Sequence, residues 1–207
     1  MRSGNGIQRS DFAAIAGWIR MGSSVLDLGC GDGTLLKYLQ ESRRVTGYGV
    51  EIDDAGVLAC VKNGVNVIQS DLEHELSEFA DGSFDYVILS QTLQAVRNSE
   101  RVISEMLRVG REGIVTFPNF GYWKNRLHVA AGHMPVSDNL PYEWFETPNI
   151  HLCTIDDFER FCASRQVKIL ERKVLTHDEP VAWWPNLLGA LAVYHFGNGS
   201  SPTRDSG

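Results

Sequence analysis

A glycine-rich turn between a predicted strand and a predicted helix constrains the fold of this chain more than any other feature. The strand is the apolar run VLDL at 25–28, interrupted only by Asp27. Glycine then occupies positions 29, 31 and 33, and apolar residues recur at helical spacing from Thr34 to Leu39. Glycine permits positive φ and a close approach of a ligand to the backbone. Because a helix N-terminus offers unpaired N–H groups and the positive end of a dipole, this turn predicts a site for a negatively charged or hydrogen-bonding ligand.

The spacing of the glycines distinguishes between classes of ligand. The dinucleotide fingerprint G-x-G-x-x-G would need a third glycine where this chain has Thr34, which disfavours a nicotinamide-dependent oxidoreductase. The pattern D-x-G-x-G-x-G instead resembles motif I of the class I S-adenosylmethionine (SAM) methyltransferase fold. The resemblance implies that the turn cradles the amino-acid end of SAM or of S-adenosylhomocysteine; the alternative is a turn that only joins strand to helix. The residues at the motif positions are Asp27, Gly29, Cys30, Gly31 and Gly33.

Strand and helix patterns alternate along most of the chain. The predicted strands span 25–28, 45–50, 65–69, 83–89, 113–117, 167–175 and 187–196, and the predicted helices 11–20, 34–39, 55–63, 99–109 and 154–164. This alternation predicts a Rossmann-like α/β fold with a seven-stranded, mostly parallel sheet flanked by helices. We expect a single domain over residues 1–196, with an aromatic-rich insertion at about 119–150 after the fifth strand, and a disordered tail over 197–207.

Composition disfavours several classes of partner. The 207 residues carry a formal net charge of −7 at pH 7, so neither nucleic acid nor an anionic membrane is expected to bind. The first residues lack the apolar core of a signal peptide, and no apolar run approaches the roughly 18 residues of a membrane span. The four cysteines form no C-x-x-C pair and no recognisable metal-ligand spacing, which predicts free thiols and no metal site. We therefore expect a cytoplasmic protein.

Residues at the ends of later strands complete the predicted ligand site. Glu51, followed by Ile52, lies twenty positions after the middle glycine of the turn, where an acid can accept hydrogen bonds from both ribose hydroxyls. In the SAM fold, an acid after the third strand accepts from the adenine amino group and the next backbone N–H meets the ring, which implies these roles for Asp71 and Leu72. Ser90 ends the fourth strand and is expected to line the pocket of the methyl donor.

Other polar residues receive mainly structural interpretations. Gln91 is a second candidate for the pocket at the end of the fourth strand. Asp53 is expected to cap the helix after it, Asp85 to stabilise the fourth strand, and Cys30 to be a small packing residue of the turn. The histidines at 128, 133 and 151 could act as bases, but a histidine in a loop is more often a simple hydrogen-bonding residue. Catalytic residues therefore stay unassigned.

The insertion carries the most specific pattern in the sequence. The segments FPNFGYW, GHMPVS and LPYEWFETPNIHLCT follow one another between positions 117 and 154. Together with VLDLGCGDGTLLKYL, GYGVEID and SFDYVILSQTLQAV upstream, they resemble the MetW family of methionine biosynthesis proteins. The resemblance implies a chain that associates with homoserine O-acyltransferase (MetX) and supports its activity, with the acyl-transfer nucleophile in that partner. This chain has no G-x-S-x-G nucleophile elbow, which agrees with that division of roles.

Two functions remain open at this point. The chain is either a SAM-binding accessory protein of the acyltransferase or a SAM-dependent small-molecule methyltransferase with an unknown acceptor. No N-P-P-Y or D-P-P-Y follows the fourth strand, which disfavours methylation of a nucleobase amine. The large apolar side chains of the insertion suit either a protein interface or a lid over the pocket. These residues are Tyr122, Trp123, Met134, Tyr142, Trp144 and Phe145.

Overall fold

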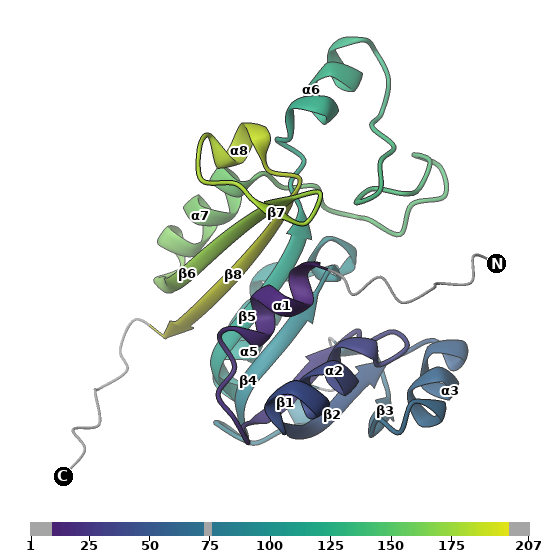
Figure 1. Cartoon of the computed structure of the whole chain (residues 1–207), viewed down its shortest axis with the longest axis vertical. Coiled ribbons are helices and arrows are strands. Elements are labelled where there is room, and N and C mark those ends of the chain that lie inside the picture. The colour runs from purple at the N-terminus through teal and green to yellow at the C-terminus, as the bar shows by residue number, and fades with distance from the viewer. Residues whose placement is uncertain (1–9, 73–75, 199–207) are drawn as a thin grey trace.

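A single mixed sheet forms the centre of the computed structural model, which describes residues 10–72 and 76–198 (Figure 1). The strand order is β3-β2-β1-β4-β5-β8-β6-β7. The strands span Ser24–Leu28 (β1), Thr46–Glu51 (β2), Val67–Gln69 (β3), Phe84–Ser90 (β4), Gly110–Pro118 (β5), Val167–Thr176 (β6), Glu179–Pro180 (β7) and Leu191–Asn198 (β8). Strands β1 to β5 are parallel, whereas β8 runs antiparallel to β5 and β6. The carboxyl ends of β1 to β5 therefore lie along one edge of the sheet.

Helices cover both faces of this sheet. Their bounds are Ser10–Ala16 (α1), Thr34–Arg43 (α2), Asp54–Lys62 (α3), Ser99–Val109 (α5), Trp123–Ala130 (α6), Ile155–Ser164 (α7) and Pro185–Leu188 (α8), with short 3-10 turns at Leu76–Glu78 (η1) and Leu93–Ala95 (η2). One apolar core joins α1, α2 and α3 to one face of the sheet, and a second joins α5 and α7 to the other. Figure 1 shows α1 and α2 in front of the sheet and α5 behind it. Among the described residues, no helix combines the length and apolar character needed to cross a bilayer.

The predicted α/β alternation is confirmed, but over residues 10–72 and 76–198 the sheet has eight strands rather than the predicted seven. Strand β6 turns back into the two-residue β7 through His177 and Asp178, at φ 51° and 70°. Such a turn usually contains glycine or asparagine, so the sequence carries little signal for it. Strand β8 begins at Leu191 because the earlier part of the predicted strand forms α8. It continues to Asn198, so the first two residues of the predicted tail belong to the sheet, and 199–207 lie outside the described residues.

Side-chain caps fix the beginnings of several helices. Asp53 accepts a hydrogen bond from the Gly56 N–H at 3.0 Å and caps α3, as predicted. Thr154 begins α7 with a reciprocal capping box. The N-terminal helix differs from the prediction, because α1 ends at Ala16 instead of continuing to residue 20. By its position in the sequence either Asp11 or Ser10 could cap this helix, but Asp11 lies inside α1 and is fully buried.

The insertion over 119–150 is attached to the rest of the fold at both ends. At its start, Asn119 is fully buried, and α6 follows. At its end, the N–H groups of Ile150 and His151 donate to the Gln94 carbonyl at 2.8 and 3.0 Å. Tyr122 is buried and therefore packs within the fold, whereas Trp144 is 69% exposed. The insertion is thus anchored beside η2, while much of its apolar surface faces solvent.

Candidate functional site

A cavity of about 380 Å³ opens at the carboxyl edge of the parallel strands. It is lined by Gly29, Val50, Glu51, Ile52, Ser70, Asp71, Leu72, Thr92, Ala95, Val96 and Arg97. Ligands of open α/β sheets bind outside the carboxyl ends of the strands, and small-molecule pockets occupy about 300–1,000 Å³. Position and size therefore make this cavity the candidate ligand site.

The glycine-rich turn forms one wall of the site with three left-handed glycines. Gly29, Gly31 and Gly33 have φ of 64°, 57° and 75°. A Cβ added to Gly29 would lie 2.8 Å from Thr92, and one added to Gly33 would lie 2.9 Å from the Cys60 sulfur. A Cβ on Gly31 would meet nothing within 4 Å. The outer two glycines are needed for packing as well as for φ, while the middle one leaves backbone open to a ligand.

Glu51 closes the turn from the end of β2. Its Oε2 accepts a hydrogen bond from the Gly31 N–H at 2.8 Å, and its Oε1 accepts from the N–H groups of Ile52 and Asp53, each at 2.9 Å. A carboxylate has about four lone-pair sites, so three are engaged here. Glu51 can take both hydroxyls of a ribose by exchanging one or more of these backbone contacts for ligand contacts.

Asp27 and Cys30 lie beneath the turn rather than in the cavity. Asp27 is buried in β1, with Gly49 of β2 and Ile88 of β4 as its neighbours across the sheet. The Cys30 sulfur lies 3.6 Å from the Cys60 sulfur. Burial raises the pKa of both thiols, so they are protonated at neutral pH. Cys30 is therefore a packing residue of the turn.

The predicted binding residues divide into two groups. Those that line the cavity are Gly29, Glu51, Ile52, Asp71 and Leu72. The other five do not line the cavity and lie in β1, in the glycine-rich turn or at the end of β4: Asp27, Cys30, Gly31, Gly33 and Ser90. The first group comes from the ends of β1, β2 and β3, and these parallel strands are adjacent, so residues far apart in the sequence share one cavity.

A second polar cluster lies at the ends of β4 and β5, and its central residue escaped the sequence analysis. Asp11 of α1 accepts hydrogen bonds through Oδ2 from Ser90 Oγ and Gln91 Nε2, both at 3.3 Å, and from Thr116 Oγ1 at 3.5 Å. Gln91 has φ 52°, an uncommon value for a residue other than glycine. Only the tertiary fold brings Asp11 to these strands, because its sequence position indicates an ordinary helix cap.

The far wall of the cavity was also missed. Thr92, Ala95, Val96 and Arg97, in and around η2, all line it. These residues follow the fourth strand directly, so the rule that sites lie at strand ends could have included them. None forms a charge pattern or a glycine motif, which is why the sequence alone did not single them out.

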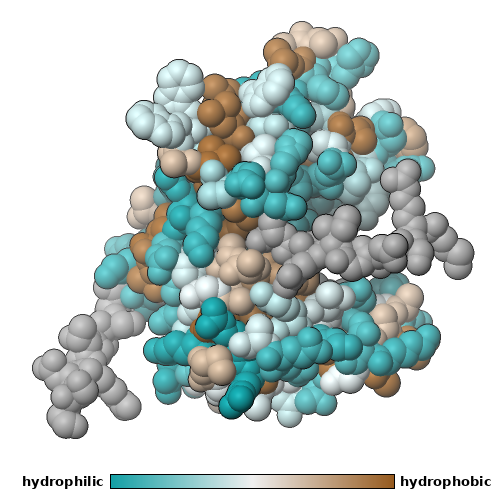
Figure 2. All heavy atoms as spheres, in the orientation of Figure 1, coloured by the Kyte–Doolittle hydropathy of each residue, from teal (hydrophilic) through white to brown (hydrophobic). Residues whose placement is uncertain are grey.

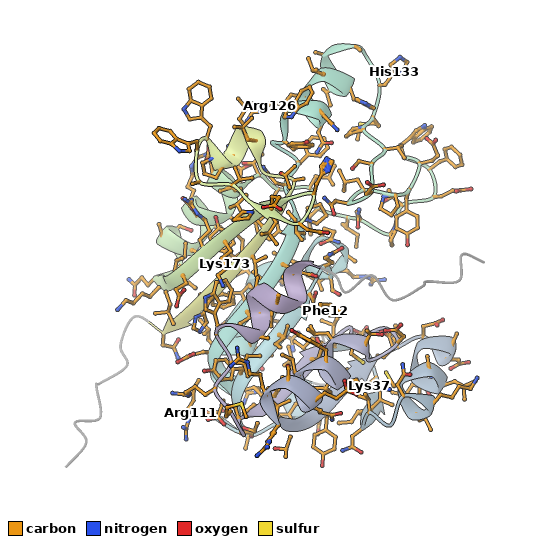
Figure 3. All side chains as sticks on the ribbon, in the orientation of Figure 1. Phe12, Lys37, Arg111, Arg126, His133 and Lys173 are labelled. Atoms are coloured by element: carbon orange, nitrogen blue, oxygen red, sulfur yellow. The ribbon has the colours of Figure 1, made fainter. Side chains whose placement is uncertain are left out.

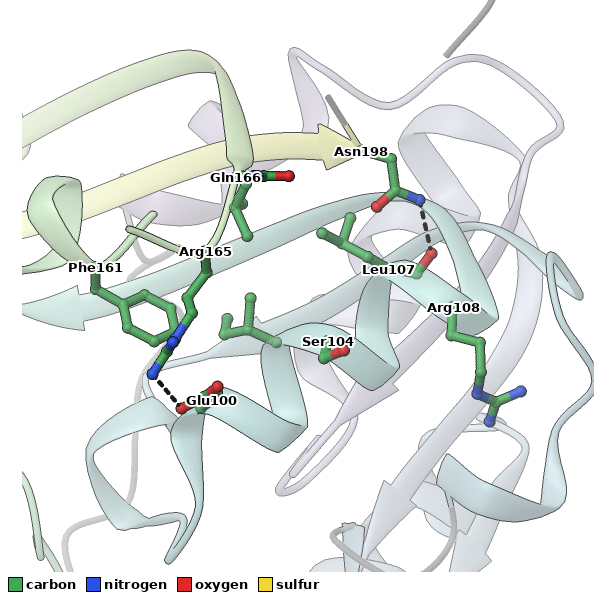
Figure 4. Close-up of a pocket in the computed structure, with 10 residues that line it drawn as sticks. Glu100, Ser104, Leu107, Arg108, Phe161, Arg165, Gln166 and Asn198 are labelled. Atoms are coloured by element: carbon green, nitrogen blue, oxygen red, sulfur yellow. Dashed lines mark hydrogen bonds and ion pairs between the residues drawn. The ribbon is translucent and has the colours of Figure 1, made fainter. Parts of the chain in front are cut away.

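A larger cavity, of about 490 Å³, lies between α5, α7 and the start of β6 (Figure 4). Its charged groups are already paired. Arg165 contacts Glu100 at 2.8 Å, and Arg108 contacts Asp81 at 2.6 Å and Glu105 at 2.8 Å. It lies near the amino end of β5, where open α/β sheets do not bind their ligands. We therefore assign it no chemistry.

The strand order, the reversed strand β8 and the glycine turn above β1 define a class I SAM-dependent methyltransferase fold. A SAM-dependent methyltransferase from Thermotoga maritima superimposes with a TM-score of 0.67 at 18% identity, over 92% of this chain and 88% of that one. One from Mesorhizobium loti gives 0.66 at 14% identity, over 91% and 98%. The [4+2]-cyclase SpnF gives 0.62 at 14% identity, over 93% and 80%. Since a cyclase shares the fold, the fold alone does not fix the reaction.

This chain belongs to the MetW family: the family described as methionine biosynthesis protein MetW matches residues 9–196. A relative from Rhodopirellula baltica, the bifunctional methionine biosynthesis protein MetXA/MetW, is 42% identical over 175 residues, which is 80% of this chain. The same stretch is 27% of the relative, so this chain spans about a quarter of the length of the protein it matches.

Proposed function

We propose that this chain is a SAM-binding accessory protein that associates with homoserine O-acyltransferase (MetX) and supports its activity in methionine biosynthesis. The observation that carries the proposal is the bifunctional MetXA/MetW relative, whose name joins both functions in one polypeptide. Two activities in one chain are held at a high effective concentration, which favours a functional association between them. In this proposal, the acyl-transfer nucleophile belongs to the acyltransferase and not to this chain.

The cavity supports SAM as the ligand of this chain. Glu51 would accept hydrogen bonds from the ribose, Asp71 from the adenine amino group, and the turn around Gly31 would face the amino-acid end. When bound, SAM supplies an activated methyl group, but an accessory role does not require its transfer. Because SAM is made from methionine, its occupancy of this cavity would report the output of the pathway to the acyltransferase.

Co-purification with the acyltransferase tests the accessory role. We expect the two chains to co-purify and acyl-CoA consumption with homoserine to rise when this chain is added. Saturating SAM should then change that rate. A Gly31→Ala variant, strained at φ 57°, is the control that should keep the association and lose the response to SAM. If the chains neither associate nor alter the rate, the accessory role is wrong; an association without any effect of SAM rejects only its reporting role.

The alternative is a SAM-dependent methyltransferase that acts on a small molecule. The observation in its favour is the cluster of Asp11, Ser90 and Thr116 at the ends of β4 and β5, close to where an acceptor could reach a bound methyl donor. Release of S-adenosylhomocysteine in the presence of a panel of candidate acceptors would support it. This release should fall in an Asp11→Asn variant. If protein that binds SAM releases no S-adenosylhomocysteine with any acceptor of the panel, the methyltransferase function is contradicted.

A further inference from the structure

Two adjacent tryptophans project into solvent from the loop between β7 and α8. Trp183 is 81% exposed and Trp184 is 73% exposed, and Leu188 of α8 is 39% exposed. A tryptophan can bury about 150–250 Å² of surface, so the fold leaves a large apolar area uncovered here. We call Trp183, Trp184 and Leu188 the tryptophan platform. Figure 2 shows apolar residues gathered over α8 on this face.

The backbone of the platform is held in an unfavourable conformation. Trp184 has φ 43° and ψ 55°, in the left-handed region that bulky residues rarely occupy. Pro185 follows it, and a proline pushes the preceding residue toward extended conformations. Two steric preferences therefore oppose this conformation, and burial of the indole does not offset them. Strain of this kind is typically retained at functional positions.

The platform is mounted rigidly on the sheet. Thr176 Oγ1 donates to the Leu188 carbonyl at 2.7 Å, and Asn119 Nδ2 donates to the carbonyls of Asn186 and Gly189 at 3.1 and 2.8 Å. A Cβ on Gly189 would lie 2.0 Å from Val174, so this helix end lies directly against β6. The backbone that carries the two indoles is therefore already held in place and loses little entropy when a partner binds.

Helix α6 extends the platform. A Cβ on Gly121, just before α6, would lie 2.6 Å from Asn186 Oδ1, so the two helices begin next to each other. Arg126, labelled in Figure 3, donates to the Gly121 carbonyl at 2.6 Å and tightens this junction. On α6, Trp123 is 39% exposed and Leu127 is 57% exposed. The two platform tryptophans could bury about 300–500 Å², and α6 brings the surface toward the roughly 800 Å² that one side of a stable complex buries.

We propose that the tryptophan platform, extended by α6, is the surface that binds homoserine O-acyltransferase. This inference rests on the proposed function. The segment FPNFGYW, which leads from β5 into α6, is among the most specific parts of the resemblance to the family, and it adjoins the platform through Asn119 and Gly121. Tryptophan is the residue most enriched among those that dominate binding energy. The face of the acyltransferase that meets the platform should offer apolar pockets for two indole rings.

The test compares two double variants with the same number of exposed large apolar side chains removed. Trp183→Ala/Trp184→Ala removes the platform, and Leu58→Ala/Val61→Ala removes residues of α3 that are 55% and 63% exposed and that belong to neither proposed site. Binding to purified acyltransferase is measured by biolayer interferometry, with melting temperature and SAM binding as checks of folding. We expect the platform variant to bind at least about 30-fold more weakly and the control to change by less than about 3-fold.

The outcomes separate this inference from the proposed function. If the wild-type chain does not bind the acyltransferase, the proposed function fails. If the wild-type chain binds and the platform variant binds equally well, the docking surface is wrong and the proposed function stands. A wild-type dimer that becomes monomeric in the platform variant, with acyltransferase binding retained, would mean that a second copy of this chain covers the platform, and that result also overturns the inference.

Discussion

Glu51 is the single residue whose replacement tests the ligand site most directly. A Glu51→Gln change puts an amide where the carboxylate accepts three backbone N–H groups, so one side of the group becomes a donor. We expect the free energy of unfolding to fall by about 1–2 kcal/mol and SAM to bind at least about tenfold more weakly. Isothermal titration calorimetry and urea unfolding measure the two effects. Glu41→Gln, on the exposed side of α2, is the control that should change neither, and unaltered SAM binding by the Glu51 variant would exclude the ribose contact.

Asp85 gives the molecule a defined dependence on pH. Burial opposes ionisation of this carboxyl group, but hydrogen bonds from the N–H and Oγ of Ser24, at 3.0 and 3.1 Å, and the charge of Arg111, at 3.2 Å, outweigh it and lower its pKa. A depressed pKa in the folded state stabilises the fold above the unfolded value of about 4, and this contribution is lost as the pH falls through the folded value. Asp85→Asn should therefore cost about 1 kcal/mol at pH 7 and progressively less below pH 4. Urea unfolding at pH 7 and below pH 4 measures the free-energy cost of the substitution under each condition. An equal cost at pH 7 and below pH 4 would refute the stabilising role of the ionised Asp85.

Residues within one short motif were predictable, and residues joined by the tertiary fold were not. The glycine turn and Glu51 could be read from spacing, because a strand, a turn and a helix impose their geometry locally. Asp11 and Ser90 are 79 positions apart, and no local pattern connects them. Trp184 precedes a proline, which predicts an extended backbone, yet its φ of 43° is left-handed.

At the scale of elements, Asn119 is the joint between β5, α6, α7 and α8. Its Oδ1 accepts hydrogen bonds from the N–H groups of Gly121 and Ile155 at 3.0 and 3.3 Å. Its Nδ2 donates to the carbonyls of Asn186, in α8, and Gly189, just after α8. Asn119→Ala would leave these buried backbone groups without partners. We expect it to lower the free energy of unfolding by about 3 kcal/mol or more, since each such group costs about 1–3 kcal/mol. Thermal and urea unfolding measure this loss, and Asn149→Ala in the insertion is the mild comparison.

Elements with strong periodicity were predicted well, and short ones were not. The helix at 99–109 matches α5, and the helix at 154–164 matches α7 with its Thr154 cap, because an amphipathic pattern and a cap specify them together. Helix α8 has four residues, and its last two fall within the run 187–196 that was predicted as one strand. Strand β7 depends on a turn without glycine. For such short elements, contacts with the rest of the sheet decide the structure and the local sequence does not.

At the scale of the whole molecule, the insertion connects the two proposed sites. Its end is hydrogen-bonded to the Gln94 carbonyl in η2, and Ala95 and Val96 beside it line the cavity. Its start carries α6, which adjoins the tryptophan platform. A ligand that shifted η2 would therefore also move the end of the insertion, and a partner bound on α6 would restrain its start. Both events would act on one continuous element.

This connection predicts a reciprocal coupling between SAM and the acyltransferase. By linkage, the factor by which SAM changes the affinity for the acyltransferase must equal the factor by which the acyltransferase changes the affinity for SAM. We expect a factor of at least about 5, or about 1 kcal/mol, measured by calorimetric titration of SAM into the chain with and without the acyltransferase. The Trp183→Ala/Trp184→Ala variant should bind SAM as the wild type does, and its SAM affinity should not respond to the acyltransferase. A factor of one for the wild-type complex would mean that SAM and the acyltransferase bind independently, and SAM would then carry no information to the partner.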